Sequence, residues 1–209
     1  MTDNIQVMRQ YMLDLGIPVK QMYRKDLYFD VSLVRRGKDH PNLPAANYTF
    51  KQYYIDSIEL FDRYIEEIKT CCKMFGLRAY ISVNAKSKIE LSKKTLLKYA
   101  EMVATEEFKK PWRLCDSVNG GLDGKEKRWI LDVDEMNMDD ERFKKYCEII
   151  ESCDSKFEKV IVVCLPTKSG AHIITHPFNS VKFENLCIEQ GLEAPEIKKN
   201  HITLLYEDL

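Results

Sequence analysis

Apolar and polar positions along the N-terminal half predict a series of separate elements. In chain order these are a helix over 4–14, a strand over 27–34, a helix over 57–75, a strand over 77–84 and a helix over 89–107. The helix over 57–75 has its apolar residues on one stripe and is expected to end at Gly76, since glycine adopts the left-handed conformation common at helix C-termini. Prolines and a glycine interrupt most of 17–54, and we assign no role to that segment.

The C-terminal half has a clearer pattern, which begins after the glycine-rich loop 119–124. The predicted elements are a strand over 128–134, a helix over 139–153 capped by Asp139, strands over 159–165 and 171–177, a helix over 180–190 and a strand over 201–206. This β-α-β-β-α-β order is typical of an RNA-recognition-motif-like (ferredoxin-like) sheet with both helices on one face. We therefore predict an α+β fold, in which an N-terminal α/β extension, with residues 1–118 mainly helical, precedes the βαββαβ unit of 128–209.

The composition indicates a single domain over 1–209. A hydrophobic content of 44% with 11% aromatics is enough for a packed core. No stretch reaches the roughly 20 apolar residues of a membrane-spanning helix, and the first ten residues lack the pattern of a signal peptide, so we expect a cytoplasmic protein without membrane contact. The seven cysteines have neither CxxC spacing nor a disulfide pattern, which predicts reduced thiols.

The charge balance argues against a protein that coats nucleic acid with its whole surface. There are 32 Lys and Arg against 33 Asp and Glu, a net charge of -1. A polyanion would have to bind at local basic clusters. The candidates are Lys86, Lys88, Lys93, Lys94 and Lys98, then Lys109, Lys110 and Arg113, then Lys125, Lys127 and Arg128.

Two carboxylates stand out at the end of the strand over 128–134. Strand alternation directs Leu131 and Val133 to the face that meets the helices, and Asp132 and Asp134 to the other, open face. Two neighbouring carboxylates repel each other unless a cation, a basic partner or water compensates, and together they suit a hard divalent cation. The pair is a candidate metal site, and a solvated strand end that runs into the acidic helix start at 139–141 is the alternative.

The turn before the third strand of the unit supplies further polar groups. In this topology the first and third strands are antiparallel neighbours, so His172 is expected beside the two aspartates. The preceding Lys168-Ser169-Gly170 turn offers an ammonium group, a hydroxyl and backbone N–H groups to phosphate oxygens, and Gly170 would allow a ligand to approach closely.

These segments resemble the motifs of a known family. WILDVDE is similar to the hydrophobic-DxD motif, and TKSGAHIIT to the Ser-and-His motif, of the archaeo-eukaryotic primase superfamily. The resemblance implies a primase-polymerase-like nucleotidyltransferase with Mg²⁺ or Mn²⁺ on Asp132 and Asp134. It also implies that Ser169 and His172 contact the triphosphate of the incoming nucleotide.

The third acidic residue of that family has no clear counterpart. Asp208 follows the strand over 201–206, and six residues at about 3.3 Å each would place it roughly 20 Å from the aspartates. His201 is at the nearer end of that strand and is a candidate metal ligand in its place. Glu196, or a chain end that curls back to bring Asp208 close, are the alternatives, as is a degenerate site.

The implied chemistry is two-metal phosphoryl transfer from a nucleoside triphosphate to a DNA or RNA 3′-hydroxyl. Lys168, Ser169, Gly170 and His172 would bind the nucleotide, and the basic segment 109–128 would guide a template. Further template-binding or priming functions are expected from another protein, such as a helicase or other replication protein. The residues do not distinguish an RNA from a DNA product or define a primer requirement.

Two rival functions remain open. His201-Ile202-Thr203 is similar to the His-x-Thr motif of two-histidine phosphoesterases, with His172 as the second histidine. Alternatively, the open sheet face is a non-catalytic nucleic-acid-binding module, although it lacks the aromatic residues on which bases stack.

Overall fold

The computed structural model describes residues 1–22, 25–40, 42 and 46–208. Its strands are β1 (Thr2–Asp3), β2 (Leu27–Arg35), β3 (Tyr48–Ile55), β4 (Arg78–Ser82), β5 (Lys86–Ser87), β6 (Trp129–Asp134), β7 (Ile161–Pro166), β8 (Gly170–Thr175), β9 (Glu196–Lys199) and β10 (Ile202–Glu207). Its helices are α1 (Ile5–Asp14), α2 (Ile58–Phe75), α3 (Lys88–Thr105), α4 (Leu114–Gly120), α5 (Glu141–Ser152) and α6 (Ser180–Glu189), with short 3-10 turns η1 (Gly37–Asp39) and η2 (Pro111–Arg113).

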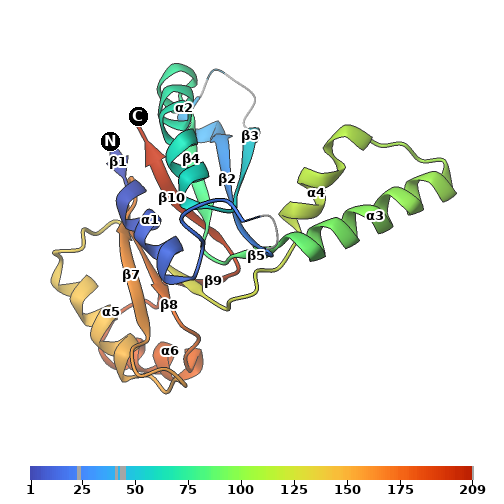
Figure 1. Cartoon of the computed structure of the whole chain (residues 1–209). Coiled ribbons are helices and arrows are strands. Elements are labelled where there is room, and N and C mark those ends of the chain that lie inside the picture. Colours follow the sequence, from blue (N-terminus) through green and yellow to red (C-terminus); the bar gives the residue numbers. More distant parts are fainter. Residues whose placement is uncertain (23–24, 41, 43–45, 209) are drawn as a thin grey trace.

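The strands form two antiparallel sheets, so the chain is a mixed α+β protein (Figure 1). The first sheet has the order β1-β10-β4-β2-β3, and β5 pairs with β2. The second sheet has the order β7-β8-β6-β9. Its strands β6, β7, β8 and β9 alternate with α5 and α6, and both helices cover the same face.

Capping residues define both ends of α2 and the start of α5. The hydroxyl of Ser57 accepts a hydrogen bond from the Leu60 N–H (3.2 Å) at the start of α2, and Gly76 closes that helix with φ 58°. The start of α5 is a correction, because its N-cap is Asp140, whose side chain accepts from the Arg142 N–H, and not Asp139.

The last strand does not lie where we predicted it. β10 pairs with β4 and β1 in the first sheet, and the short β9 takes the position beside β6. Asn200, with φ 53°, turns the chain between the two strands. β10 is buried on both faces from Thr203 to Glu207, which suits the interior of the first sheet. β9 contains one apolar residue, Ile197, and could not be distinguished from a loop by hydrophobic pattern.

The second sheet has packed residues on both faces. Leu131 and Val133 pack with α5 and α6, as predicted. On the opposite face Ile130 and Ile174 are fully buried in a core shared with α1, α2 and the first sheet. The expected open face is therefore covered along the middle of the sheet, and only its end is accessible at Asp132 and Asp134.

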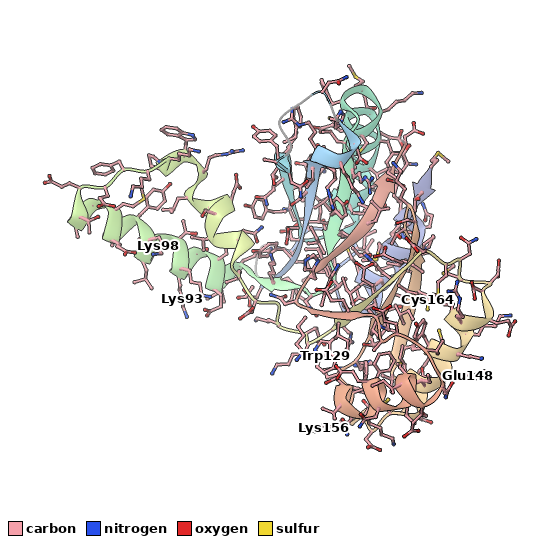
Figure 2. The ribbon with its side chains drawn as sticks, turned by 180° about the vertical axis from the view of Figure 1, so that it is seen from behind. Lys93, Lys98, Trp129, Glu148, Lys156 and Cys164 are labelled. Carbon is pink, nitrogen blue, oxygen red and sulfur yellow. The ribbon has the colours of Figure 1, made fainter. Side chains whose placement is uncertain are left out.

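The N-terminal part contains both helices and strands. It contributes β1 to β5, so a sheet forms its centre, and β3 was not anticipated from the sequence. Helices α3 and α4 form an arm that projects from this sheet, as both views show (Figures 1 and 2). No residue of α3 is buried.

Two expectations about the whole chain can be compared with the described residues. No helix among them is long and apolar enough to cross a membrane. All seven cysteines are free thiols in the structure, and Cys72, Cys153 and Cys187 are buried.

Candidate functional site

The register of β6 and β8 places the predicted residues side by side. Asp132 is paired with His172, and Asp134 with Gly170. The turn between β7 and β8 is closed by a hydrogen bond from the Thr167 N–H to the Gly170 carbonyl (2.8 Å). The antiparallel β6–β8 pairing therefore confirms the predicted neighbourhood of Asp132, Asp134 and His172.

His172 links the two sheets. Its Nε2 lies 3.2 Å from Asp132 Oδ1, and its Nδ1 lies 2.8 Å from the hydroxyl of Thr203 on β10. With the Nε2 proton directed at Asp132, the Thr203 hydroxyl donates to Nδ1. Thr203 is fully buried, and the His172 side chain is only 12% exposed, so the imidazole has one fixed orientation.

Lys198 on β9 provides a second cation for Asp132. Its ammonium group pairs with Asp132 Oδ2 and lies 3.3 Å from Glu196 Oε2. The hydrogen bond from His172, together with Lys198 and against the effect of burial, holds the pKa of Asp132 well below its usual range. Burial acts to lower the pKa of Lys198, but the ion pair with Asp132 outweighs it and raises that pKa. Asp132 is therefore an ionised carboxylate with both oxygens engaged.

Asp134 has a different environment at the strand end. It is exposed, and no hydrogen bond or ion pair joins it to another residue of the described chain. Lys168 and Ser169, in the turn beside it, are exposed as well. The Lys168 ammonium lies 3.6 Å from Asp39 Oδ1 of η1, so this turn also reaches the first sheet.

A cleft of about 320 Å³ lies between the ends of the two sheets and gathers these groups. Its lining includes six residues that we predicted from the sequence, namely Asp132, Asp134, Lys168, Ser169, His172 and His201. The opposite wall consists of the first sheet and of the segment with η1 that follows β2, and it carries Arg36, Lys38 and Arg78. Figure 2 shows the side chains of both sheets from behind.

Cations from the first sheet and β9 were missed in the sequence. Arg36 and Arg78 are distant in the chain from the two motifs and reach the cleft only because the sheets meet. Lys198 reaches it from β9, the neighbour of β6 in the second sheet, which we did not predict. Arg36 also donates to the Tyr80 hydroxyl (3.1 Å). No local spacing signals such contacts, since each of these residues lies in an ordinary strand or turn.

Arg78 lies in a buried ionic cluster at the cleft wall. Its guanidinium donates to Asp39 (2.6 Å) and lies 3.3 Å from Glu207 Oε2. Burial opposes ionisation of Asp39, yet the Arg78 hydrogen bond lowers the pKa of that carboxyl. The two carboxylates compensate much of the Arg78 charge.

Gly170 has a packing role that the sequence did not indicate. A Cβ atom at this position would lie 2.0 Å from the Val133 carbonyl oxygen and 3.0 Å from Asp134 Cα. The glycine therefore allows β8 to approach β6 closely at the strand end, which aligns the Ser169 turn with Asp134.

The candidates for a third metal ligand lie in different places. His201 is exposed and lines the cleft, with Nδ1 directed at the Ile202 carbonyl (3.2 Å). Glu196 is opposite Asp132 in the β6–β9 register, but its side chain is 72% exposed. Glu207 is buried at the far end of β10, and Asp208 follows it outside the cleft lining.

The donor set suits a divalent cation only in part. Asp132 and Asp134 project from alternate positions of one strand and supply the oxygen ligands that Mg²⁺ and Mn²⁺ prefer. The ammonium of Lys198 occupies one oxygen of Asp132, so a cation already lies at this carboxylate. Among the described residues, no three His, Cys, Asp or Glu side chains are arranged to hold a metal. Two carboxylates with bound water or phosphate oxygens would have to suffice.

The rival functions can be compared with this geometry. His172 and His201 line the same cleft, but Thr175, which would complete a His-x-Thr-like motif on β8, is fully buried. A base-stacking platform on the second sheet would need the face that Ile130 and Ile174 share with the first sheet.

Comparisons of the chain with family models, with curated proteins and with solved structures found no match.

Proposed function

We propose that this protein is a metal-dependent nucleotidyltransferase of the primase-polymerase type, which joins a nucleoside triphosphate to the 3′ end of a DNA or RNA strand. The observation that carries the proposal is the composition of one cleft. Two carboxylates from β6, the Lys168-Ser169 turn and His172 face a wall of arginine and lysine side chains from a different sheet. A triphosphate with a divalent cation needs this combination of acidic and basic groups.

The topology of the second sheet supports the same proposal. Its order β7-β8-β6-β9, with α5 and α6 on one face, is the arrangement expected for an RNA-recognition-motif-like unit, once β9 replaces β10 as the fourth strand. In the family that the two motifs resemble, a unit of this type carries the catalytic residues.

The roles of the acidic residues follow from their environments. Asp134, which is exposed, and Asp132 would hold the cation, and Lys198 would have to leave Asp132. The bound Mg²⁺ or Mn²⁺ would supply charge neutralisation and a lower pKa for the attacking hydroxyl. His172 keeps Asp132 ionised and aligned through its hydrogen bond.

The basic residues of the cleft would bind the triphosphate. Lys168 and Ser169 offer an ammonium group and a hydroxyl on an exposed turn, and Arg36 and Lys38 extend from the opposite wall. Neither Arg36 nor Lys38 has a carboxylate partner within the part of the chain that the structure describes. Lys198, once displaced from Asp132, would be a further contact for a phosphate oxygen.

The test is nucleotide incorporation on primed and unprimed templates with Mg²⁺ or Mn²⁺. Asp134→Asn is the most informative variant, because the side chain is exposed and without partners, so the fold should be unaffected. We expect activity to fall on the order of 100-fold. Asp139→Asn, an exposed aspartate outside the cleft lining, is the matched control and should retain activity.

The proposal is wrong if Asp134→Asn protein retains full metal-dependent incorporation. It is also wrong if the wild-type protein incorporates no nucleotide with either metal on any of the templates. Loss in Asp132→Asn alone would be less decisive, because this change also removes the partner of His172 and Lys198.

A further inference from the structure

A second groove, next to the candidate site, has the features of a binding site for a polyanion with exposed bases. It has a volume of about 660 Å³ and lies between the edge strand β3 and the arm formed by α3, η2 and α4. The residues that line it include Tyr48, Phe50, Lys109, Lys110 and Arg113. None of them belongs to the two motifs that point to nucleotidyl transfer.

Two of the four cations that line this groove lack acidic partners among the described residues, whereas Lys51 pairs with Glu67 and Lys109 with Glu107. Lys110 and Arg113 on one wall form no ion pair with any described residue, and neither does Arg35, whose guanidinium lies 5.9 Å from the centre of the Tyr48 ring. Arg113 lies 6.0 Å from the same ring. In a chain with a net charge of -1, such a local excess of unpaired positive charge favours a polyanion over a peptide or a second copy of the chain.

Exposed aromatic rings accompany these charges. Tyr48 is 47% exposed in the groove, and Trp112, in η2 beside Arg113, is 80% exposed. Large aromatic side chains at the surface provide platforms for unpaired bases, and the bases of a duplex are not available for such stacking. The groove therefore suits a single strand.

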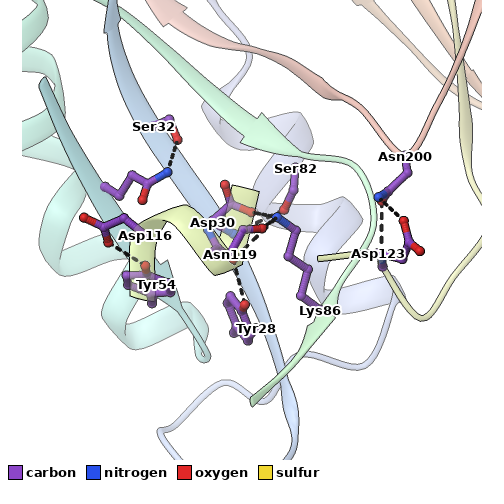
Figure 3. A network of polar contacts seen from close by, with 12 residues as sticks. Tyr28, Asp30, Ser32, Tyr54, Ser82, Lys86, Asp116, Asn119, Asp123 and Asn200 are labelled. Carbon is purple, nitrogen blue, oxygen red and sulfur yellow. Dashed lines mark hydrogen bonds and ion pairs between the residues drawn. The ribbon is translucent and has the colours of Figure 1, made fainter. Parts of the chain in front are cut away.

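The arm is held in place by buried polar contacts rather than by apolar packing (Figure 3). The Tyr28 hydroxyl donates to Asn119 Oδ1 (2.7 Å), and the buried Lys86 ammonium donates to the Asn119 carbonyl (2.9 Å) while pairing with Asp30 (2.8 Å). The Tyr54 hydroxyl donates to Asp116 of α4 (2.7 Å). These bonds attach α4 to the first sheet, so the groove exists before any ligand binds.

The groove leads to the candidate active site. Asn47 lines both the groove and the cleft, and its side chain accepts from the Gly37 N–H (3.2 Å). Arg35, beside the groove, is followed by Arg36, which lines the cleft. A strand in the groove would thus have its end directed toward Asp134 and the Ser169 turn.

We infer that the groove between β3 and the α3–α4 arm binds single-stranded nucleic acid and directs it into the cleft. The use of the strand as template or primer rests on the proposed function. Binding itself does not, because it requires neither the two aspartates nor a metal.

The experiment measures fluorescence anisotropy of a labelled oligonucleotide of about 16 nucleotides, in EDTA and over a range of salt concentrations. Single-stranded DNA, single-stranded RNA and duplex DNA are compared. We expect both single strands to bind more tightly than the duplex, and the comparison of the two identifies the preferred sugar.

The variants separate charge from stacking. Lys110→Glu/Arg113→Glu should weaken binding about tenfold or more and reduce the slope of log affinity against log salt by about 1.4, or about 0.7 per phosphate contact. Tyr48→Ala/Trp112→Ala should weaken binding by roughly 5- to 100-fold with little change in that slope. Lys110, Arg113 and Tyr48 of the groove and Trp112 beside it are all exposed, and circular dichroism would verify the fold.

Matched controls lie on the same arm outside the groove. Lys93→Glu/Lys94→Glu makes the same change in charge on α3, and Leu97→Ala removes an exposed apolar side chain there. Equal loss in the groove variants and these controls would overturn the inference, as would unchanged affinity in the groove variants or tighter binding of duplex DNA.

Failure of this inference can be told apart from failure of the proposed function. Asp134→Asn protein should bind the single strand as tightly as the wild type in EDTA while losing incorporation. If the wild type binds single strands through the groove but incorporates no nucleotide, the inference about the groove is supported and the proposed nucleotidyltransferase activity is refuted. If the groove variants incorporate nucleotides as well as the wild type does, only the inference that the groove directs the strand into the cleft is refuted.

Discussion

Replacement of Lys198 by methionine tests whether this lysine occupies the position of a catalytic cation. In the structure its ammonium group pairs with Asp132, and the side chains are 23% and 19% exposed, respectively. Exposed ion pairs contribute about 0–1 kcal/mol to stability, and disruption of buried pairs costs about 3–5 kcal/mol. The contribution of this partly buried pair should lie between these values. We expect a loss of about 1–2 kcal/mol in the free energy of unfolding of the metal-free protein.

For a chain of this size, each kcal/mol corresponds to a decrease of about 2–4 °C in Tm. Lys198→Met should therefore lower Tm in EDTA by about 2–8 °C. The effect of Mn²⁺ should have the opposite sign. Without Lys198, the carboxylate of Asp132 is available, so Mn²⁺ binds the variant more tightly and raises its Tm more than that of the wild type. A metal concentration of 100 times Kd would add about 2.7 kcal/mol.

The assay is thermal unfolding followed by circular dichroism at neutral pH, in EDTA and in millimolar MnCl₂. Lys199→Met is the control, because Lys199 is the adjacent residue of β9 and its ammonium lies over the Trp129 ring (4.9 Å), away from Asp132. An equal Mn²⁺-dependent increase in Tm for the Lys198 variant and the wild type would refute the idea that ammonium and metal compete for Asp132.

Three further predictions concern the geometry around the same strand end. Gly170→Ala should cost about 1–3 kcal/mol, because the new methyl would lie 2.0 Å from the Val133 carbonyl and must separate β8 from β6; urea unfolding measures this, and an unchanged midpoint would contradict it. Thr203→Val leaves Nδ1 of His172 without its partner and should cost about 1–2 kcal/mol in the same assay, whereas Thr203→Ser, which keeps the hydroxyl, should recover most of the loss. Finally, the pKa of Asp132 is lower in the folded than in the unfolded protein. Its contribution to stability is therefore present above the unfolded pKa of about 4 and is lost as the pH falls from there toward the lower pKa of the folded state. The unfolding free energy of the wild type should decline more steeply below about pH 5 than that of Asp132→Asn, and parallel profiles would argue against the ion pair.

The helices show how far hydrophobic pattern alone extends. α2 was predicted almost to the residue, because its apolar residues recur with the helical period and Gly76 follows its last turn. β6 and β8 were also predicted from pattern, and in β6 the alternation correctly placed Leu131 and Val133 against the helices. Their pairing also followed from the order of the elements, so the neighbourhood of Asp132, Asp134 and His172 was accessible from the sequence.

The partition of strands between sheets was not accessible in this way. β9 and β10 are separated by two residues, yet they belong to different sheets. β10, the more hydrophobic of the two, joins the first sheet, and β9 pairs with β6 in the second. Pattern describes how well a strand can be buried, but it does not specify the partner, because pairing depends on which edge is free when the chain has collapsed. The role of Thr203 as the partner of His172 follows from this choice.

The sequence by itself thus determined the elements and the acidic half of the candidate site, since both depend on residues within short segments and on one local β-hairpin order. Only the tertiary structure decided most of the basic half, because Arg36 and Arg78 come close to the aspartates across the interface between the sheets and Lys198 comes from the unpredicted strand β9. It also decided that the face beyond Asp132 is buried and that the arm forms a groove against β3. Contacts between residues far apart in the chain depend on the total balance of burial and strand pairing, which the spacing of residues within a short segment does not predict.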